Sequence, residues 1–149
     1  MSPLVSTLEF TATLACALFA GAALYVNVVE HPARMSLETR VAALQWAPSY
    51  RRATWLQAPL ALLSFACGIA AWLLGAGFGW LIAALLIGAV VPFTFVVIMP
   101  INSKLLAPGR DLGSAETRAL LVRWDRLHAV RTILSIFGVT VYLLSLLGA

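Results

Sequence analysis

Residues 53–103 read ATWLQAPLALLSFACGIAAWLLGAGFGWLIAALLIGAVVPFTFVVIMPINS and contain no Asp, Glu, Lys, Arg or His. A helix that crosses a bilayer needs about 20 predominantly apolar residues, so this block is long enough for two crossings. Its one break is the segment GAGFG at residues 75–79, whose glycines suit a tight turn. The block therefore predicts a hairpin of two membrane-spanning helices.

The rest of the chain has the same character. Of its 149 residues, 62% are hydrophobic and only 11% are charged, and the mean hydropathy is +0.95. This composition excludes the water-soluble classes of protein. We expect one integral membrane domain over residues 1–149, an all-α four-helix transmembrane bundle. Its spans are predicted at about 4–29, 53–74, 78–99 and 127–147.

The positions of the basic residues predict an orientation. All ten Lys and Arg residues lie between positions 34 and 131, and none lies in the segments before the first span, after the last span or between the second and third. The positive-inside rule then places the connections 30–52 and 100–126 in the cytoplasm and both termini outside it, in the cell inner membrane. The positions of the basic residues reflect membrane orientation, so the net charge of +4 does not indicate nucleic-acid binding. We expect the lipid bilayer and no nucleic acid as a partner.

The two long connections resemble each other. Residues 36–46, SLETRVAALQW, and 114–124, SAETRALLVRW, share five identities in eleven positions. This predicts two parallel repeats of span, cytoplasmic helix and span, related by a pseudo-twofold axis along the membrane normal. We expect Ser36 and Ser114 to cap the two cytoplasmic helices. We also expect Pro48 to break the first of them, whereas nothing interrupts the second copy.

Polar residues gather at span ends on the predicted cytoplasmic side. They form three groups, which are Asn27, Glu30 and His31; Asn102; and Trp124, His128 and Arg131. The first group shares a helix face until Pro32, which we expect to end the helix, and the last group shares one stripe of the fourth span. The three groups can therefore converge at one depth.

Ionisable groups at membrane depth are costly, which makes these residues functional candidates. A structural interpretation stays open, because a Glu30–Arg131 ion pair, a snorkelling Arg and an interfacial Trp would also account for them. The functional interpretation is preferred because both histidines of the chain, His31 and His128, fall at this depth. An imidazole can act as a base or a ligand near neutral pH.

Three segments resemble the anthrone oxygenase-like family of small four-helix membrane proteins: GAALYVNVVEHPAR at 21–34, MPIN at 99–102 and WDRLHAVR at 124–131. The resemblance covers nearly the whole chain. Fungal relatives in this family oxidise anthrones to anthraquinones in polyketide pathways without a known cofactor, and bacterial members are largely of unknown function. The resemblance implies a site built from His31, Asn102, Trp124, His128 and Arg131.

The same residues support a definite chemistry. A hydrophobic aromatic substrate with an acidic C–H bond would enter from the bilayer, a neutral histidine would remove the proton, and the carbanion would reduce dioxygen without a cofactor. We expect His31, His128, Asn102 and Arg131 to be catalytic, the last two by stabilising the enolate oxygen. Substrate contacts are expected from Asn27, Glu30 and Trp124.

Three alternatives stay open. The two histidines with Glu30 or Asp125 have the composition of an iron or copper site, and a haem could lie between the two imidazoles. The protein could also be a non-enzymatic accessory or scaffold subunit of a larger membrane complex, or a homo-oligomer. The sequence does not decide the substrate.

Overall fold

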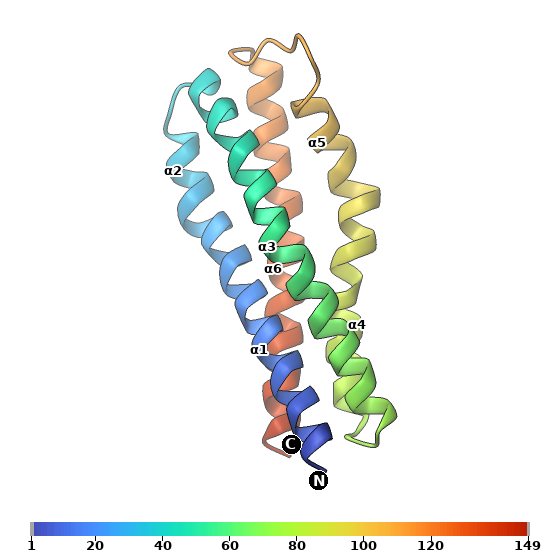
Figure 1. Cartoon of the computed structure of the whole chain (residues 1–149). Helices are drawn as coiled ribbons and strands as arrows, with labels where there is room; N and C mark the ends of the chain where they lie inside the picture. The colour runs from blue at the N-terminus through green and yellow to red at the C-terminus, as the bar shows by residue number, and fades with distance from the viewer. Residues whose placement is uncertain (1, 149) are drawn as a thin grey trace.

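The computed structural model of the chain describes residues 2–148, and within them four long helices lie side by side (Figure 1). The first runs through three segments, α1 (Pro3–Tyr25), η1 (Val26–Glu30) and α2 (His31–Met35). The second is α3 (Thr39–Leu73), and the third joins α4 (Phe78–Phe93), η2 (Thr94–Ile98) and α5 (Met99–Leu105). The fourth is α6 (Ala115–Leu146). The predicted all-α four-helix bundle is confirmed.

Both chain ends lie at one end of the bundle, together with the α3–α4 turn (Figure 1). We call this the termini end. The loops 36–38 and 106–114 lie at the opposite end, which we call the connection end. The turn forms where it was predicted, since Gly75 and Gly77 have φ angles of +90° and +109°, a region that residues with a Cβ rarely adopt.

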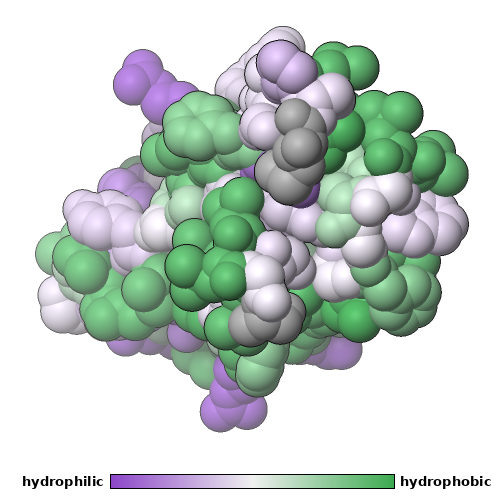
Figure 2. All heavy atoms as spheres, turned by 90° about the horizontal axis from the view of Figure 1, so that it is seen from below, coloured by the Kyte–Doolittle hydropathy of each residue, from purple (hydrophilic) through white to green (hydrophobic). Residues whose placement is uncertain are grey.

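The outside of the bundle is apolar. All four helices are long and apolar enough to cross a membrane, with mean hydropathies of 1.7 to 2.8 over their best windows. Large hydrophobic side chains such as Trp55, Val96 and Phe137 are exposed around them. Seen from the termini end, the surface is dominated by green and white residues, and purple residues lie mainly at the rim (Figure 2). A surface of this kind requires a lipid environment, so the chain is a multi-pass membrane protein.

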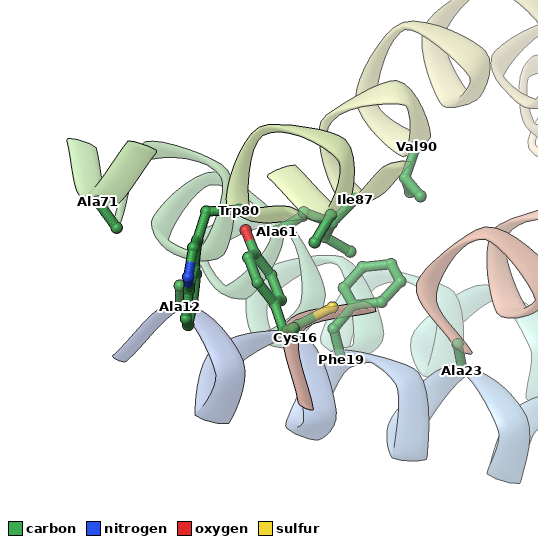
Figure 3. Close-up of a cluster of buried hydrophobic side chains, with 11 residues drawn as sticks. Ala12, Cys16, Phe19, Ala23, Ala61, Ala71, Trp80, Ile87 and Val90 are labelled. Carbon is green, nitrogen blue, oxygen red and sulfur yellow. The ribbon is translucent and has the colours of Figure 1, made fainter. Parts of the chain in front are cut away.

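Small residues and a few aromatic rings fill the core near the termini end (Figure 3). Cys16 and Phe19 of α1 lie against Ala61 of α3 and Ile87 of α4, all of them buried. Polar groups in this core are paired with backbone carbonyls. Ser64 Oγ donates to the Ala12 carbonyl over 2.9 Å. This packing joins the helices without using the polar residues at the connection end.

Two π-helical segments interrupt the first and third helices at η1 and η2. Pro32 is the second residue after η1, and Pro100 is the second residue after η2. The helices continue past these prolines to Met35 and Leu105. The expectation that Pro32 ends the first helix is therefore wrong. A π turn bonds each N–H to the fifth carbonyl back, which widens the turn and makes room for the proline ring.

These π segments bear on the predicted repeat. The first residues of η1 and η2 are 68 positions apart in the sequence, and so are their last residues. Pro32 and Pro100 have the same spacing. The same local distortion thus recurs at equivalent places in the two halves. The twofold axis that would relate the halves stays a prediction.

Two details of the connections differ from expectation. Pro48 does not break α3, which continues from Thr39 to Leu73. The rings of Trp46 and Tyr50 stack across it with centroids 5.1 Å apart and an interplanar angle of 4°. The carbonyl that Pro48 leaves without its helical donor belongs to Leu44, which is an exposed residue. The continuous α6 is confirmed.

Of the two predicted helix caps, one forms and the other does not. Ser114 accepts a hydrogen bond from the Thr117 N–H over 3.1 Å, so it caps α6 as expected. Ser36 does not cap α3, which begins after Glu38. The Ser36 hydroxyl donates to the Ala33 carbonyl instead and closes α2.

Candidate functional site

Asn27 joins the first and last helices inside the connection end. Its Nδ2 donates to the Asp125 carbonyl over 3.1 Å and to Asp125 Oδ1 over 2.8 Å. Its Oδ1 lies 2.9 Å from His128 Nδ1 and accepts a hydrogen bond from Thr132 Oγ1 over 2.6 Å. Because both oxygens of Asp125 only accept, the orientation of the Asn27 amide is determined by its partners.

This contact determines the tautomer of His128. An amide oxygen can only accept, so the proton of a neutral His128 ring must lie on Nδ1. The Nε2 atom then carries the free lone pair. The His128 side chain is buried, with 2% of its surface exposed, and this arrangement presents a preoriented base.

Trp124 is in contact with both imidazoles. Its ring centroid lies 5.4 Å from that of His31 and 4.9 Å from that of His128. Trp46 meets Trp124 edge-on at 5.8 Å. The structure thus brings the two histidines to one aromatic cluster, although they come from helices about 100 residues apart in sequence.

A buried ion pair supports the first of these histidines. Arg34 pairs with Glu30, and its Nη1 lies 3.1 Å from His31 Nδ1. A guanidinium only donates, so His31 Nδ1 accepts and its proton lies on Nε2, which is buried without a hydrogen-bond partner in residues 2–148. Ser49 and Gln45 complete the network. The suggested Glu30–Arg131 pair does not form, because Arg34 lies one turn from Glu30 and takes its carboxylate.

Arg131 has no carboxylate partner among residues 2–148. The two ion pairs within the described part of the chain are Arg34–Glu30 and Arg110–Glu116. Arg131 Nη2 donates to Gln57 Oε1 over 2.8 Å, and the guanidinium lies 5.4 Å from the centroid of the Phe19 ring. Its Nε is buried and unpartnered within residues 2–148. A positive charge is therefore held in the membrane domain without a neutralising anion.

His128, Trp124 and Arg131 line a small cavity of about 20 Å³, which is room for about one water molecule. Its lining residues are Val26, Arg34, Trp46, Ser49, Tyr50, Ala53, Thr54, Gln57, Trp124, His128 and Arg131. We call it the polar cavity. An imidazole, a guanidinium and an indole thus line one small cavity.

Four of the seven residues singled out from sequence do not line the polar cavity, namely Asn27, Glu30, His31 and Asn102. His31 lies against Trp124 but is not part of the wall. Asn102 is 1% exposed, and both of its amide atoms lack a hydrogen-bond partner in the described residues. The sequence could not distinguish a place behind the cavity wall from a place on it.

The residues do not fit the metal alternatives. Across residues 2–148, no group of three or more His, Cys, Asp or Glu side chains is arranged to hold a metal ion. His31 Nδ1 accepts from Arg34, so its Nε2 carries the proton and offers no lone pair to a metal, and Trp124 packs against both imidazole rings.

Sequence reasoning missed Tyr50, Thr54 and Gln57 of α3, which form one side of the polar cavity. Gln57 carried a usable signal. It is a carboxamide within the uncharged block 53–103, where an unpartnered polar side chain would be costly, and in the structure it is 2% exposed and accepts from Arg131.

The fold and this site define a class of protein, a multi-pass helical membrane protein with a buried base and an unpaired guanidinium at one end of a four-helix bundle. The family described as Anthrone oxygenase matches residues 46–141. The chain belongs to this family.

Individual relatives agree with this assignment. Anthrone oxygenase ptaC of Pestalotiopsis fici is 31% identical over 120 residues, which cover 68% of this chain and 82% of that protein. Anthrone oxygenase tpcL of Aspergillus fumigatus is 40% identical over 67 residues, which cover 43% of this chain and 42% of that protein. No solved structure matches the chain significantly. The family resemblance inferred from the sequence is confirmed.

Proposed function

We propose that this protein is a membrane oxygenase that converts an activated CH₂ group of a hydrophobic, anthrone-like aromatic to a carbonyl with dioxygen. The observation that supports the proposal is the hydrogen bond from His128 Nδ1 to Asn27 Oδ1, which leaves the lone pair of Nε2 free on a residue that lines the polar cavity. The family membership supports an oxygenase reaction, and the apolar exterior supports a substrate that partitions into the bilayer.

The first step is proton transfer. His128 Nε2 accepts a proton from the acidic C–H bond, and the electron pair delocalises onto the substrate's carbonyl oxygen as an enolate. Arg131 stabilises the negative charge, because it lines the same cavity and no carboxylate of the described residues pairs with it. A general base of this kind contributes about 10²- to 10⁴-fold to the rate.

Dioxygen completes the reaction. The carbanion is oxidised by dioxygen, a C–O bond forms, and the resulting peroxide takes up a proton from the histidinium. Loss of water then leaves the carbonyl, so that one CH₂ group and one O₂ give one C=O group and one H₂O. No further reductant is needed.

The other candidate residues take supporting roles in this proposal. Trp124 provides an aromatic face beside His128, and Asn27 orients the base. His31, Glu30 and Asn102 hold the surrounding structure, because none of them lines the polar cavity. We further propose that the protein lies in the cell inner membrane and works without a metal or organic cofactor.

Oxygen consumption tests the proposal. The purified protein in detergent should accelerate oxygen uptake by anthrone and the appearance of anthraquinone absorbance, and treatment with EDTA should not change the rate. His128→Gln, which retains a donor for Asn27, should lower the rate about 10²-fold or more. The matched control is Trp55→Ala, since Trp55 is 83% exposed on the lipid-facing surface.

Two results would overturn the proposal. One is a folded wild-type protein that does not accelerate anthrone oxidation. The other is a His128→Gln protein as active as Trp55→Ala. If His128→Gln instead lowers thermal stability or recovery with partner proteins and no turnover is seen, the accessory-subunit interpretation gains the support.

A further inference from the structure

A second cavity of about 110 Å³ lies between α3 and the α4–η2 helix, next to the polar cavity. Its lining residues are Phe19, Tyr50, Thr54, Ala58, Ala61, Val90, Val91, Thr94, Phe95, Met99 and Arg131. We call it the apolar groove. Ala58 and Phe95 are exposed at its outer edge, so the apolar groove opens onto the lipid-facing surface. None of its apolar residues belongs to the site derived from the sequence.

The apolar groove contains one charged side chain, Arg131. Its only side-chain hydrogen bond within residues 2–148 goes to the neutral Gln57, and its buried Nε is unpartnered. An unpaired cation at membrane depth is costly and marks a binding site for a complementary group. The chemistry that fits an apolar groove with one guanidinium is an apolar molecule with an acceptor or anionic oxygen.

The apolar groove also adjoins the base. Tyr50, Thr54 and Arg131 line both the apolar groove and the polar cavity, so these three side chains form the partition between them. A ligand in the apolar groove whose oxygen contacts Arg131 has its polar edge directed toward the cavity that His128 lines.

We propose that the apolar groove binds a ring of a planar aromatic ligand, with a carbonyl or phenolate oxygen on Arg131. This inference rests on the proposed function and assigns the substrate a place. A dry cavity of about 150 Å³ holds benzene. The apolar groove is smaller, at about 110 Å³, so it holds at most one ring, and the remaining rings extend toward the bilayer. The ligand thus enters from the membrane between α3 and η2.

Binding measurements test the groove separately from the reaction. The probe is anthraquinone, and its binding is followed by quenching of tryptophan fluorescence in the detergent-purified protein. Ala58→Phe fills the rim of the apolar groove and should raise the Kd about tenfold or more, because a pocket of this size cannot also hold a second ring. Ala66→Phe is the matched control, being exposed on the same helix outside the groove, and should change the Kd less than about twofold.

A second pair of probes tests the contact with Arg131. Anthracene has the same three rings as anthraquinone but no oxygen. Anthraquinone should bind the wild-type protein about tenfold more tightly than anthracene, and Arg131→Gln should remove this difference while leaving the anthracene Kd unchanged.

The outcomes separate the two proposals. If Ala58→Phe and Ala66→Phe bind anthraquinone equally well, the apolar groove is not the site, whether or not the protein turns over anthrone. If Ala58→Phe selectively weakens binding but the wild-type protein does not oxidise anthrone, the groove assignment holds and the oxygenase proposal fails. Thermal unfolding verifies that each variant is folded, and Ala58→Leu replaces Ala58→Phe if the latter does not fold.

Discussion

Asn27 shows how one neutral side chain can organise a site inside a membrane. It bonds to Asp125, His128 and Thr132 at the same time, and its two ends meet groups of opposite hydrogen-bonding character. A carboxylate in its place would add a charge beside Asp125. The amide instead sets the tautomer of His128 without adding a charge at membrane depth.

The first prediction concerns this contact. Asn27→Ala should lower kcat for anthrone oxidation about 10²-fold and change KM little, because the ring of His128 loses the partner that keeps its proton on Nδ1. Steady-state oxygen uptake gives both constants. Thr132→Val is the control, since it removes one hydrogen bond to Asn27 but leaves the contact with His128. An Asn27→Ala enzyme with the wild-type kcat would contradict this role.

The second prediction concerns the buried ion pair. The side chain of Arg34 is 2% exposed and that of Glu30 is 22% exposed. Glu30→Gln leaves the guanidinium buried without its anion and should lower the free energy of unfolding by about 3 kcal/mol. The double variant Glu30→Gln/Arg34→Gln should lose less than the single one. Both are measured by denaturation in detergent, and a Glu30→Gln protein as stable as the wild type would show that Ser49 and Gln45 suffice.

At the scale of elements, small residues allow the close contact between α3, α4 and α6. A Cβ added at Gly68 would lie 2.9 Å from Tyr142 Cζ and 3.0 Å from Ala84 Cβ, closer than side-chain carbons normally approach. A Cβ added at Gly21 would meet nothing within 4 Å. The two glycines look alike in the sequence, and only the tertiary structure distinguishes them.

The third prediction uses this difference. Gly68→Ala should lower thermal stability by about 1–3 kcal/mol through overpacking, and it should also displace the Tyr142 hydroxyl from its hydrogen bond to the Ser64 carbonyl. Gly21→Ala should leave stability unchanged or raise it by up to about 1 kcal/mol, because alanine favours the helix. Thermal unfolding of the two variants in the same detergent measures this difference in stability. Equal behaviour would mean that α3 and α6 separate more easily than their contact indicates.

Two prolines also lie inside helices that the sequence predicted they would end. Pro32 and Pro48 were expected to end helices, yet both lie within continuous ones. Near Pro32 the π segment provides the space that the ring needs, and at Pro48 the rings of Trp46 and Tyr50 stack across the proline. A missing hydrogen bond is visible in the sequence, but the compensation for it is not.

At the scale of the whole molecule, the ends of the bundle differ in charge. The connection end contains the loops 36–38 and 106–114 and the basic residues around them, whereas the termini end has no Lys or Arg in its turn at residues 74–77. The proposed site lies toward the connection end. We therefore propose that the polar cavity is nearer the cytoplasmic face of the membrane.

The fourth prediction tests this orientation. Alkaline phosphatase, which is active only outside the cytoplasm, should be active when fused after residue 149 and inactive when fused at position 109 in the loop 106–114. The reverse pattern would place both connections outside. Fusions of a fluorescent protein that folds only in the cytoplasm should give the complementary result.

The sequence by itself determined the architecture of this protein. Hydropathy decides how many segments prefer lipid, and the loop glycines at residues 75–79 show where the chain reverses; both are local properties that need no knowledge of neighbours. Only the tertiary structure decided the partners. Arg34 rather than Arg131 neutralises Glu30, and Tyr50 and Gln57 of α3 complete a cavity whose base comes from α6. The reason is geometric, since a π turn and the rotation of each helix about its axis set which side chains meet, and periodicity along one helix says nothing about the phase of the next.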